Sequence, residues 1–178
     1  MSNKVPKTVS IITIGDELLI GQTIDTNSAW MAQELNKAGF SINRRVAIGD
    51  DWDNIWNALN EEEKKNDIIL ITGGLGPTSD DITKPLLCSY FGGKLIVDEL
   101  AKQNVVDIFT KKLNRPLLER NLKQAEVPDV CTVIQNLRGT APGMWFEKDG
   151  KIFVSMPGVP FEMKGMMDEY VIPELLKK

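Results

Sequence analysis

The stretch from Ile68 to Asp81 constrains the fold more than any other part of the sequence. It begins with branched apolar residues that do not alternate with polar ones, a pattern typical of a strand buried on both faces of a parallel sheet. It continues through three glycines and ends in two aspartates, directly before a helical pattern. Glycines allow close approach to a ligand, and the N–H groups of such a turn favour an anion such as phosphate.

The carboxylates of Asp80 and Asp81 would repel a bare phosphate. They suit this loop if a cation lies between them and the anion, or if one of them acts as a base. Two simpler roles remain open: the glycines form only a tight turn, and the aspartates favour the positive end of the next helix. The loop is neither a Walker motif, since no Gly-Lys-Ser/Thr follows, nor a GxGxxG motif.

The composition is that of an ordinary globular domain. The 178 residues suffice for one domain, or for one with a small extra, and are 42% apolar and 26% charged. The net charge of −4 argues against a nucleic-acid partner. No apolar run reaches transmembrane length and the N-terminus lacks a secretory h-region, so we expect a cytoplasmic protein without a membrane partner.

Histidine is absent, and the two cysteines are Cys88 and Cys131. Since they lie far apart and lack CxxC spacing, we expect buried free thiols in a reducing compartment. Without histidine, acid–base or metal chemistry depends on carboxylates, which prefer hard cations such as Mg²⁺.

Hydrophobic periodicity and turn residues predict alternating strands and helices. We expect strands over 9–14, 41–48, 68–72, 94–97 and 130–135, and a β-hairpin that joins 144–147 to 151–155. We expect helices capped by Asp25 or Thr26, by an aspartate of the pair 50–51, and near Thr83, with a last helix over 161–177. The segment 16–23 is expected to be a loop, and 98–130 a helical insertion or lid.

The β-α order implies an α/β fold with a mostly parallel sheet and helices on both faces. Ligands of such sheets bind beyond the carboxyl ends of the strands. The strand exits carry glycine, acidic or proline-glycine loops, which are Gly15-Asp16-Glu17, Gly49-Asp50-Asp51, Gly73 to Asp81, and Pro157-Gly158. We therefore predict one site where these loops meet at the edge of the sheet.

Several polar residues near these loops have structural alternatives to ligand contact. They are Asp50 or Asp51 as a helix cap, Asp16 and Glu17 in a solvated turn, Asn27 and Ser28 in a first helical turn, Glu162 at a helix start, and Arg138 and Lys164 as surface charge. As ligand contacts, Arg138 and Lys164 would instead bind phosphate.

Several motifs of the sequence resemble a known family. They are Gly15-Asp16-Glu17-Leu18-Leu19 with Gly21 and Asp25-Thr26-Asn27, Thr72 through Thr83, Arg120-Asn121 with Lys123-Gln124-Ala125, Gly139 through Gly143, and Met156 through Pro160 with Glu162-Met163. Together they resemble the amino-terminal domain of the competence/damage-inducible protein CinA, over nearly the whole chain from about Val9. The wider superfamily has the three-layer molybdopterin-binding fold; its Thr-Gly-Gly-Thr-Gly loop has Leu75 here in place of the second threonine.

This resemblance implies an activity. CinA-like domains of this type are described as ADP-ribose pyrophosphatases that use a divalent metal (Mg²⁺, Mn²⁺ or Co²⁺) and release AMP and ribose 5-phosphate. The resemblance implies Asp50 and Asp81 as catalytic residues, and we expect Asp80 and Asp81 to bind the metal. The expected substrate contacts are Gly15, Asp16, Glu17, Asn27, Thr72, Gly73, Gly74, Gly76, Pro77, Thr78, Pro157 and Gly158.

Three functions are therefore expected, in this order: metal-dependent hydrolysis of ADP-ribose, binding or adenylylation of molybdopterin, and non-catalytic nucleotide sensing or oligomerisation. The ligand is accordingly a small nucleotide or a pterin phosphate. Full-length CinA adds a carboxyl-terminal deamidase, which we do not expect within residues 1–178, a single domain. Since proteins of this fold associate, we expect a homo-oligomer.

Overall fold

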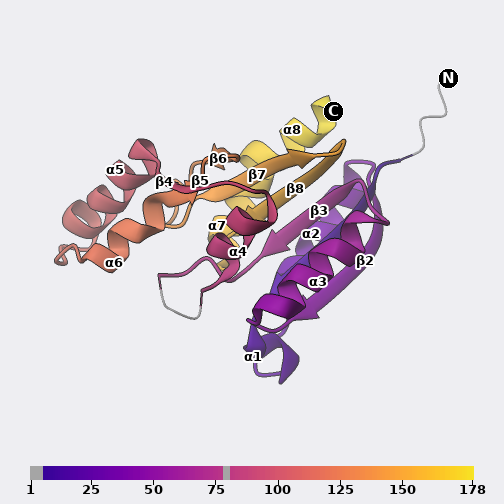
Figure 1. Cartoon of the computed structure of the whole chain (residues 1–178), viewed down its shortest axis with the longest axis horizontal. Coiled ribbons are helices and arrows are strands. Elements are labelled where there is room, and N and C mark those ends of the chain that lie inside the picture. The colour runs from indigo at the N-terminus through magenta and orange to yellow at the C-terminus, as the bar shows by residue number, and fades with distance from the viewer. Residues whose placement is uncertain (1–5, 78–80) are drawn as a thin grey trace.

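The centre of the molecule is a six-stranded sheet (Figure 1), in a computed structural model that describes residues 6–77 and 81–178. Its strand order is β2 (Ser41–Ile48), β1 (Thr8–Ile14), β3 (Ile68–Thr72), β8 (Lys151–Met156), β7 (Gly143–Lys148) and β6 (Thr132–Ile134). The first four strands are parallel, and β7 is antiparallel to both of its neighbours. The expectation of a mostly parallel sheet with one hairpin is confirmed.

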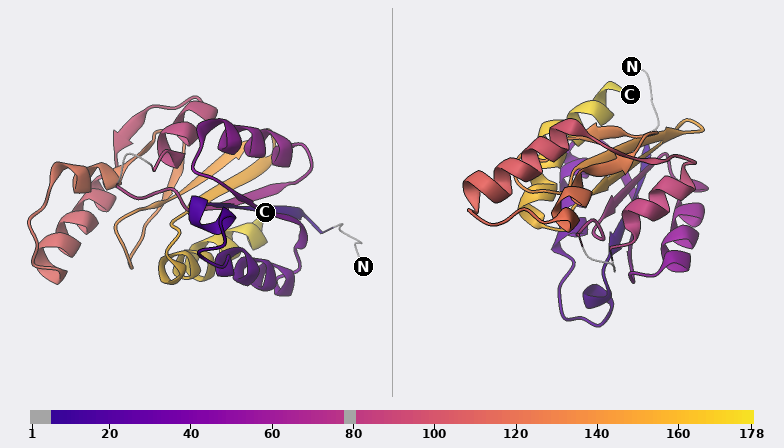
Figure 2. Two further views of the ribbon diagram at one scale, coloured as in Figure 1. Left: turned by 90° about the horizontal axis from the view of Figure 1, so that it is seen from below. Right: turned by 60° about the vertical axis from the view of Figure 1, so that its left-hand side comes forward.

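Helices cover both faces of this sheet (Figure 2). They are α2 (Thr26–Lys37), α3 (Trp52–Glu63), α4 (Thr83–Tyr90), α7 (Pro160–Met166) and α8 (Ile172–Lys177). One face packs against α2 and α7 through Met31 and Met163, and the other against α3 and α4 through Ile55 and Leu86, all fully buried. The expected three-layer α/β fold is therefore confirmed.

Strand β3 lies in the middle of the parallel part of the sheet. All of its residues are 0% exposed, because it is flanked by β1 and β8 and covered on both faces. This burial explains why its sequence is apolar without alternation. Thr13, Thr72 and Met156 are neighbours in register, so the loops that follow β1, β3 and β8 leave the sheet at the same edge.

Aspartate caps fix the starts of two of the covering helices. Asp25 accepts a hydrogen bond from the Ser28 backbone N–H at 2.9 Å and begins α2. Asp51 accepts one from the Asn54 N–H at 3.0 Å and begins α3. Of the two candidate caps at positions 50 and 51, Asp51 therefore has the structural role, as expected of a residue in this position.

Two segments differ from expectation. The segment 16–23, expected to be a loop, contains the one-turn helix α1 (Asp16–Leu19). Within the helical insertion, β4 (Leu95–Val97) pairs with β5 (Glu126–Pro128) in a second, two-stranded sheet, and β5 was not expected. This pairing joins segments far apart in the sequence and leaves no local periodicity that would predict it.

The rest of the insertion is helical, as expected. It comprises α5 (Glu99–Asp107), a π-helical turn (Ile108–Lys112), α6 (Glu119–Leu122) and a 3₁₀ turn (Lys123–Ala125). The last helix is also interrupted, by a π-helical turn (Met167–Val171) just before Pro173, which has no N–H to continue an α-helical ladder.

Two further observations bear on the expectations from composition. Cys88 and Cys131 are free thiols, but only Cys88 is buried, whereas Cys131 is half-buried against the core on the α3 and α4 side of the sheet. Among residues 6–77 and 81–178, the structure contains no helix with the length and apolarity needed to span a bilayer.

Candidate functional site

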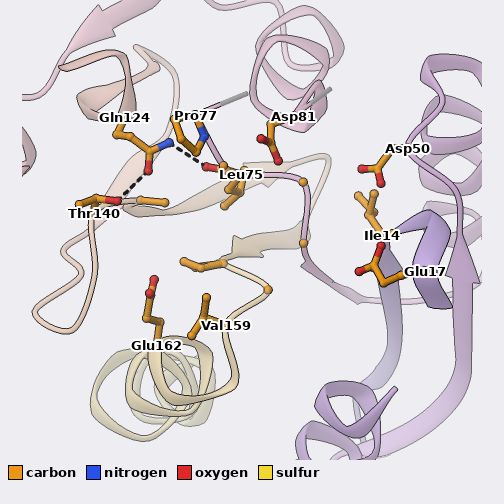
Figure 3. A pocket seen from close by; sticks show the side chains of 17 residues that line it. Ile14, Glu17, Asp50, Leu75, Pro77, Asp81, Gln124, Thr140, Val159 and Glu162 are labelled. Atoms are coloured by element: carbon orange, nitrogen blue, oxygen red, sulfur yellow. Dashed lines mark hydrogen bonds between the residues drawn. The ribbon is translucent and has the colours of Figure 1, made fainter. Parts of the chain in front are cut away.

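The loops after β1, β2, β3 and β8 meet in one cleft of about 440 Å³ at the carboxyl edge of the sheet (Figure 3). The structure brings together there most of the residues predicted from the sequence, namely Gly15, Glu17, Asp50, Gly73, Gly74, Gly76, Pro77, Asp81, Pro157 and Gly158. Thr78 and Asp80, the latter a predicted metal ligand, lie outside the described residues. The cleft is formed by segments that are distant in sequence, as the parallel topology predicts.

Three other predicted contacts, Asp16, Asn27 and Thr72, lie outside the main cleft and form hydrogen bonds to the loops that line it. Asn27 Nδ2 donates a hydrogen bond to the Gly158 carbonyl at 2.8 Å, and Thr72 Oγ1 donates one to the Pro157 carbonyl at 2.9 Å. Asp16 exchanges hydrogen bonds with the segment after β2. None of the three lines the main cleft, although Asn27 and Thr72 line a smaller adjoining pocket of about 130 Å³.

Glycine is required at several positions of the loop after β3. Gly73 and Gly74 have φ of 105° and 68°, a region that strains other residues. A Cβ at Gly73 would overlap the carbonyl oxygen of Ile14, and one at Gly76 would lie 2.5 Å from Asp81 Oδ2. Gly76 does not have positive φ; a Cβ there would displace the flexible Asp81 carboxylate, so glycine permits its close approach rather than the turn.

Asp50, Glu17 and Asp81 present carboxylates to the same side of the cleft (Figure 3). Burial raises the pKa of Asp50 above its ordinary value of 3.8, and the charges of Asp16, Glu17 and Asp81 raise it further, while the hydrogen bond from the Asp16 backbone opposes these effects. This part of the cleft is therefore strongly negative.

No lysine or arginine within the described residues lines this cleft. Arg138 instead pairs with Glu169, and Lys164 Nζ lies over the Trp30 ring, 5.3 Å from its centroid. The alternative that these two cations contact phosphate is therefore not supported by their positions. An anionic ligand in the cleft needs a positive partner from elsewhere, because the carboxylates alone would repel it.

The donors present fit a divalent cation in one particular mode. Among the described residues, no three His, Cys, Asp or Glu side chains come close enough to form a metal cage. Mg²⁺ is usually held by one or two carboxylates together with substrate phosphates and water rather than by a full protein cage. Asp50 and Asp81, facing one cleft beside a glycine loop, suit this shared coordination.

The sequence did not predict that Gln124 and Thr140 line the cleft. Gln124 is 3% exposed; its Nε2 donates to the Leu75 carbonyl at 3.3 Å, and its Oε1 accepts from Thr140 Oγ1 at 2.9 Å. Lys84 Nζ donates to the Gln124 carbonyl at 3.1 Å, and burial lowers the pKa of Lys84 to about 8. Gln124 therefore connects the helical insertion to the glycine loop.

Glu162 is a third polar residue whose place in the cleft was not predicted. Its position after Pro160 suggested a helix start, and it does lie in the first turn of α7. In the sequence, Gln124, Thr140 and Glu162 stood out only as members of the family motifs, and those motifs assigned them no role.

The class of protein follows from the sheet, the glycine loop and a direct comparison of sequences. Residues 10–177 match the family described as a probable molybdopterin binding domain, and the chain belongs to this family. Within it, the chain is a CinA-like domain. It is 47% identical over 169 residues to a "CinA-like protein" of Flavobacterium psychrophilum, covering 95% of this chain and 40% of that protein.

Other relatives agree with this placement. A "putative competence-damage inducible protein" of Caldicellulosiruptor saccharolyticus is 43% identical over 167 residues, covering 94% of this chain and 40% of that protein. The chain thus spans about 40% of the length of these curated relatives.

Solved structures show the same fold. The protein CinA of Thermoplasma acidophilum, described as of unknown function, superposes with a TM-score of 0.82 at 34% identity, covering 96% of this chain and 98% of that one. A molybdenum cofactor biosynthesis protein B superposes with a TM-score of 0.62 at 18% identity, covering 98% of this chain and 94% of that one, which shows the fold alone.

Proposed function

We propose that the cleft binds a nucleoside diphosphate sugar and hydrolyses its pyrophosphate bond, with ADP-ribose as substrate and AMP and ribose 5-phosphate as products. The observation that carries the proposal is the meeting of Asp50 and Asp81 with the glycine loop in one cleft, which no lysine or arginine of residues 6–77 and 81–178 lines. Such a site suits a diphosphate that arrives with a divalent metal.

Three groups of cleft residues have different roles in this proposal. The Gly73 N–H donates to the Met156 carbonyl at 3.1 Å, so the phosphate donors would be the N–H groups of Gly74 and Gly76, beside the start of α4. Asp50 and Asp81 would hold Mg²⁺, Mn²⁺ or Co²⁺, which supplies charge neutralisation and a lowered pKa for bound water. Asp50 is also placed to orient the attacking water, since it lines the same cleft as the glycine loop.

Hydrolysis adds one water across the P–O–P bridge. The water oxygen bonds to one phosphorus, the bridging oxygen leaves with the other, and two phosphomonoesters result. The test is incubation of the protein with ADP-ribose and each metal, followed by separation of AMP. Asp81→Asn and Asp50→Asn should lower turnover by about 100-fold or more, a typical loss for a group acting in the transition state.

Asp51→Asn is the matched control, because Asn caps helices as well as Asp does. It changes the neighbouring carboxylate without touching the cleft, so turnover should remain near that of the wild type. An Asp81→Asn variant with full activity would remove that residue from the mechanism.

A second candidate is the binding of a pterin phosphate, favoured by the family description as a probable molybdopterin binding domain. The same glycine loop would hold its phosphate. Competition between a pterin phosphate and ADP-ribose in equilibrium binding separates the two candidates. Ligand binding that raises thermal stability without product under any metal would instead favour the non-catalytic sensing role. We further propose a cytoplasmic homo-oligomer, testable by fractionation and light scattering.

A further inference from the structure

Glu162 has the position of a ligand-binding side chain that the hydrolytic chemistry does not use. It lies at the opposite end of the cleft from Asp50 and Glu17, below Gln124 and Thr140 (Figure 3). Among residues 6–77 and 81–178, no three carboxylates come close enough to hold a metal together, so Glu162 does not form a metal cage with Asp50 and Glu17. A separate reason is therefore needed for a half-buried carboxylate at this point.

The surroundings of Glu162 fix its orientation. Asn136, which is 3% exposed, donates from Nδ2 to Glu162 Oε2 at 2.7 Å and to the Ala141 carbonyl at 2.9 Å. The Oδ1 of Asn136 accepts from the Arg138 backbone N–H at 3.0 Å. These three bonds settle which end of the Asn136 amide carries the donors, so the amide is fully engaged in holding the carboxylate.

The loop that faces Glu162 is fitted to it. A Cβ at Gly139 would overlap the Glu162 carboxylate, so only glycine allows the close approach. Asn104, from helix α5 of the insertion, donates to the carbonyls of Asn136 at 2.8 Å and Gly139 at 2.9 Å and holds this loop in place. The carboxylate therefore belongs to a preorganised wall made by three separate segments.

The bonding capacity of Glu162 is only partly used. Across residues 6–77 and 81–178, neither lysine nor arginine forms an ion pair with it, and its Oε1 accepts no hydrogen bond from these residues. The nearby Arg138 guanidinium is engaged by Glu169 instead. Since this wall offers the acceptors of Glu162 beside the neutral side chains of Gln124 and Thr140, it suits hydroxyl groups rather than phosphate.

We propose that Glu162 accepts hydrogen bonds from the vicinal hydroxyls of a ribose and thereby sets the specificity of the site. A carboxylate that binds ribose hydroxyls is a general solution in nucleotide sites. The proposal rests on the proposed function, since it assigns the sugar of the same substrate. The glycine loop would then bind the diphosphate, Asp50 and Asp81 the metal, and Glu162 the sugar, each in a different part of one cleft.

Equilibrium binding with a divalent metal tests this. The probes are the α,β-methylene analogue of ADP-ribose, which cannot be hydrolysed at its bridge, and two versions that lack the 2-hydroxyl of either the adenosine or the terminal ribose. One of the two deoxy probes should bind wild type about 10-fold more weakly than the parent, the cost of a hydrogen bond to a charged group. Which one it is identifies the ribose.

Glu162→Gln should bind the parent probe more weakly than wild type by a similar factor. It should bind the parent probe and that deoxy probe with equal affinity. Gln keeps an acceptor for Asn136, so the thermal midpoint should stay near that of wild type. Glu174→Gln is the control, because Glu174 lies in α8 outside the cleft and its ion pair is with Lys177 rather than with Arg138. It should bind all probes as wild type does.

Three results would overturn the proposal. They are unchanged affinity of Glu162→Gln for the parent probe, equal affinity of wild type for all three probes, and a loss in Glu162→Gln that appears only with a pterin phosphate. If the probes bind with the expected differences in affinity but no AMP is released from ADP-ribose, the proposed hydrolysis is contradicted. The contact between Glu162 and the ribose is then still supported.

Discussion

Asp16 and Asp50 hold each other by reciprocal hydrogen bonds. The Asp50 N–H donates to Asp16 Oδ1 at 3.1 Å, and the Asp16 N–H donates to Asp50 Oδ2 at 3.3 Å. The exchange joins the exits of β1 and β2 and fixes the direction of the Asp50 carboxylate. Asp16 therefore acts as a positioning residue, although the sequence suggested a substrate contact.

Asp16→Ala should lower kcat for ADP-ribose by about 10-fold or more, because a misplaced catalytic group costs far more than its distance suggests. KM should change less, since Asp16 does not line the cleft. Asp16→Asn keeps an acceptor for the Asp50 N–H and should recover most of the activity. Steady-state kinetics of the three proteins check this; equal losses in both variants would contradict a role through that bond.

Asp50→Asn should make the protein more stable at pH 7 while lowering turnover by about 100-fold or more. The folded state raises the pKa of Asp50 above 3.8, so it binds the proton more tightly than the unfolded chain does. Stability contributed by this group is present below pH 3.8 and is lost as the pH rises through the folded pKa. The thermal midpoint of Asp50→Asn should exceed that of wild type at pH 7, and the difference should disappear below pH 3.8. An advantage unchanged with pH would contradict this origin.

Substitution of two glycines in the same loop should have different effects. Gly73→Ala should lower the free energy of unfolding by at least about 1–3 kcal/mol, since the added Cβ meets backbone and φ is positive. Gly76→Ala displaces the Asp81 carboxylate instead and should reduce activity more than stability. Denaturant unfolding and turnover of both variants check this. A stable, fully active Gly76→Ala would show that Asp81 need not approach the loop.

Asn27→Ala should lower the free energy of unfolding by about 0.5–1.5 kcal/mol, because the part-buried hydrogen bond from Asn27 to the Gly158 carbonyl is lost. KM for ADP-ribose should rise as well, since Gly158 lines the cleft. Asn36→Ala, an exposed substitution of the same type in α2, is the control and should leave both values unchanged. Urea unfolding and kinetics measure the two effects. Equal stability of the two variants would contradict the role of this hydrogen bond.

The order of strands and helices and the edge at which the loops meet were readable from the sequence. Apolar runs such as Ile68 to Thr72, glycine and proline at strand ends, and aspartates before helices each act over a few residues, so their pattern is local. The parallel topology then predicted that Asp50 and Asp81 would face one cleft, and they do.

Roles that depend on long-range partners were decided by the tertiary structure. Asp50 and Asp51 are the same residue type at adjacent positions, so the sequence does not distinguish them. In the structure Asp51 caps α3, whereas Asp50 lines the cleft. Gln124 and Glu162 gained their places through bonds to Leu75 and Asn136, 49 and 26 positions away. Local propensity carries no information on such pairs, because their energy arises only when the packed sheet brings separate segments into contact.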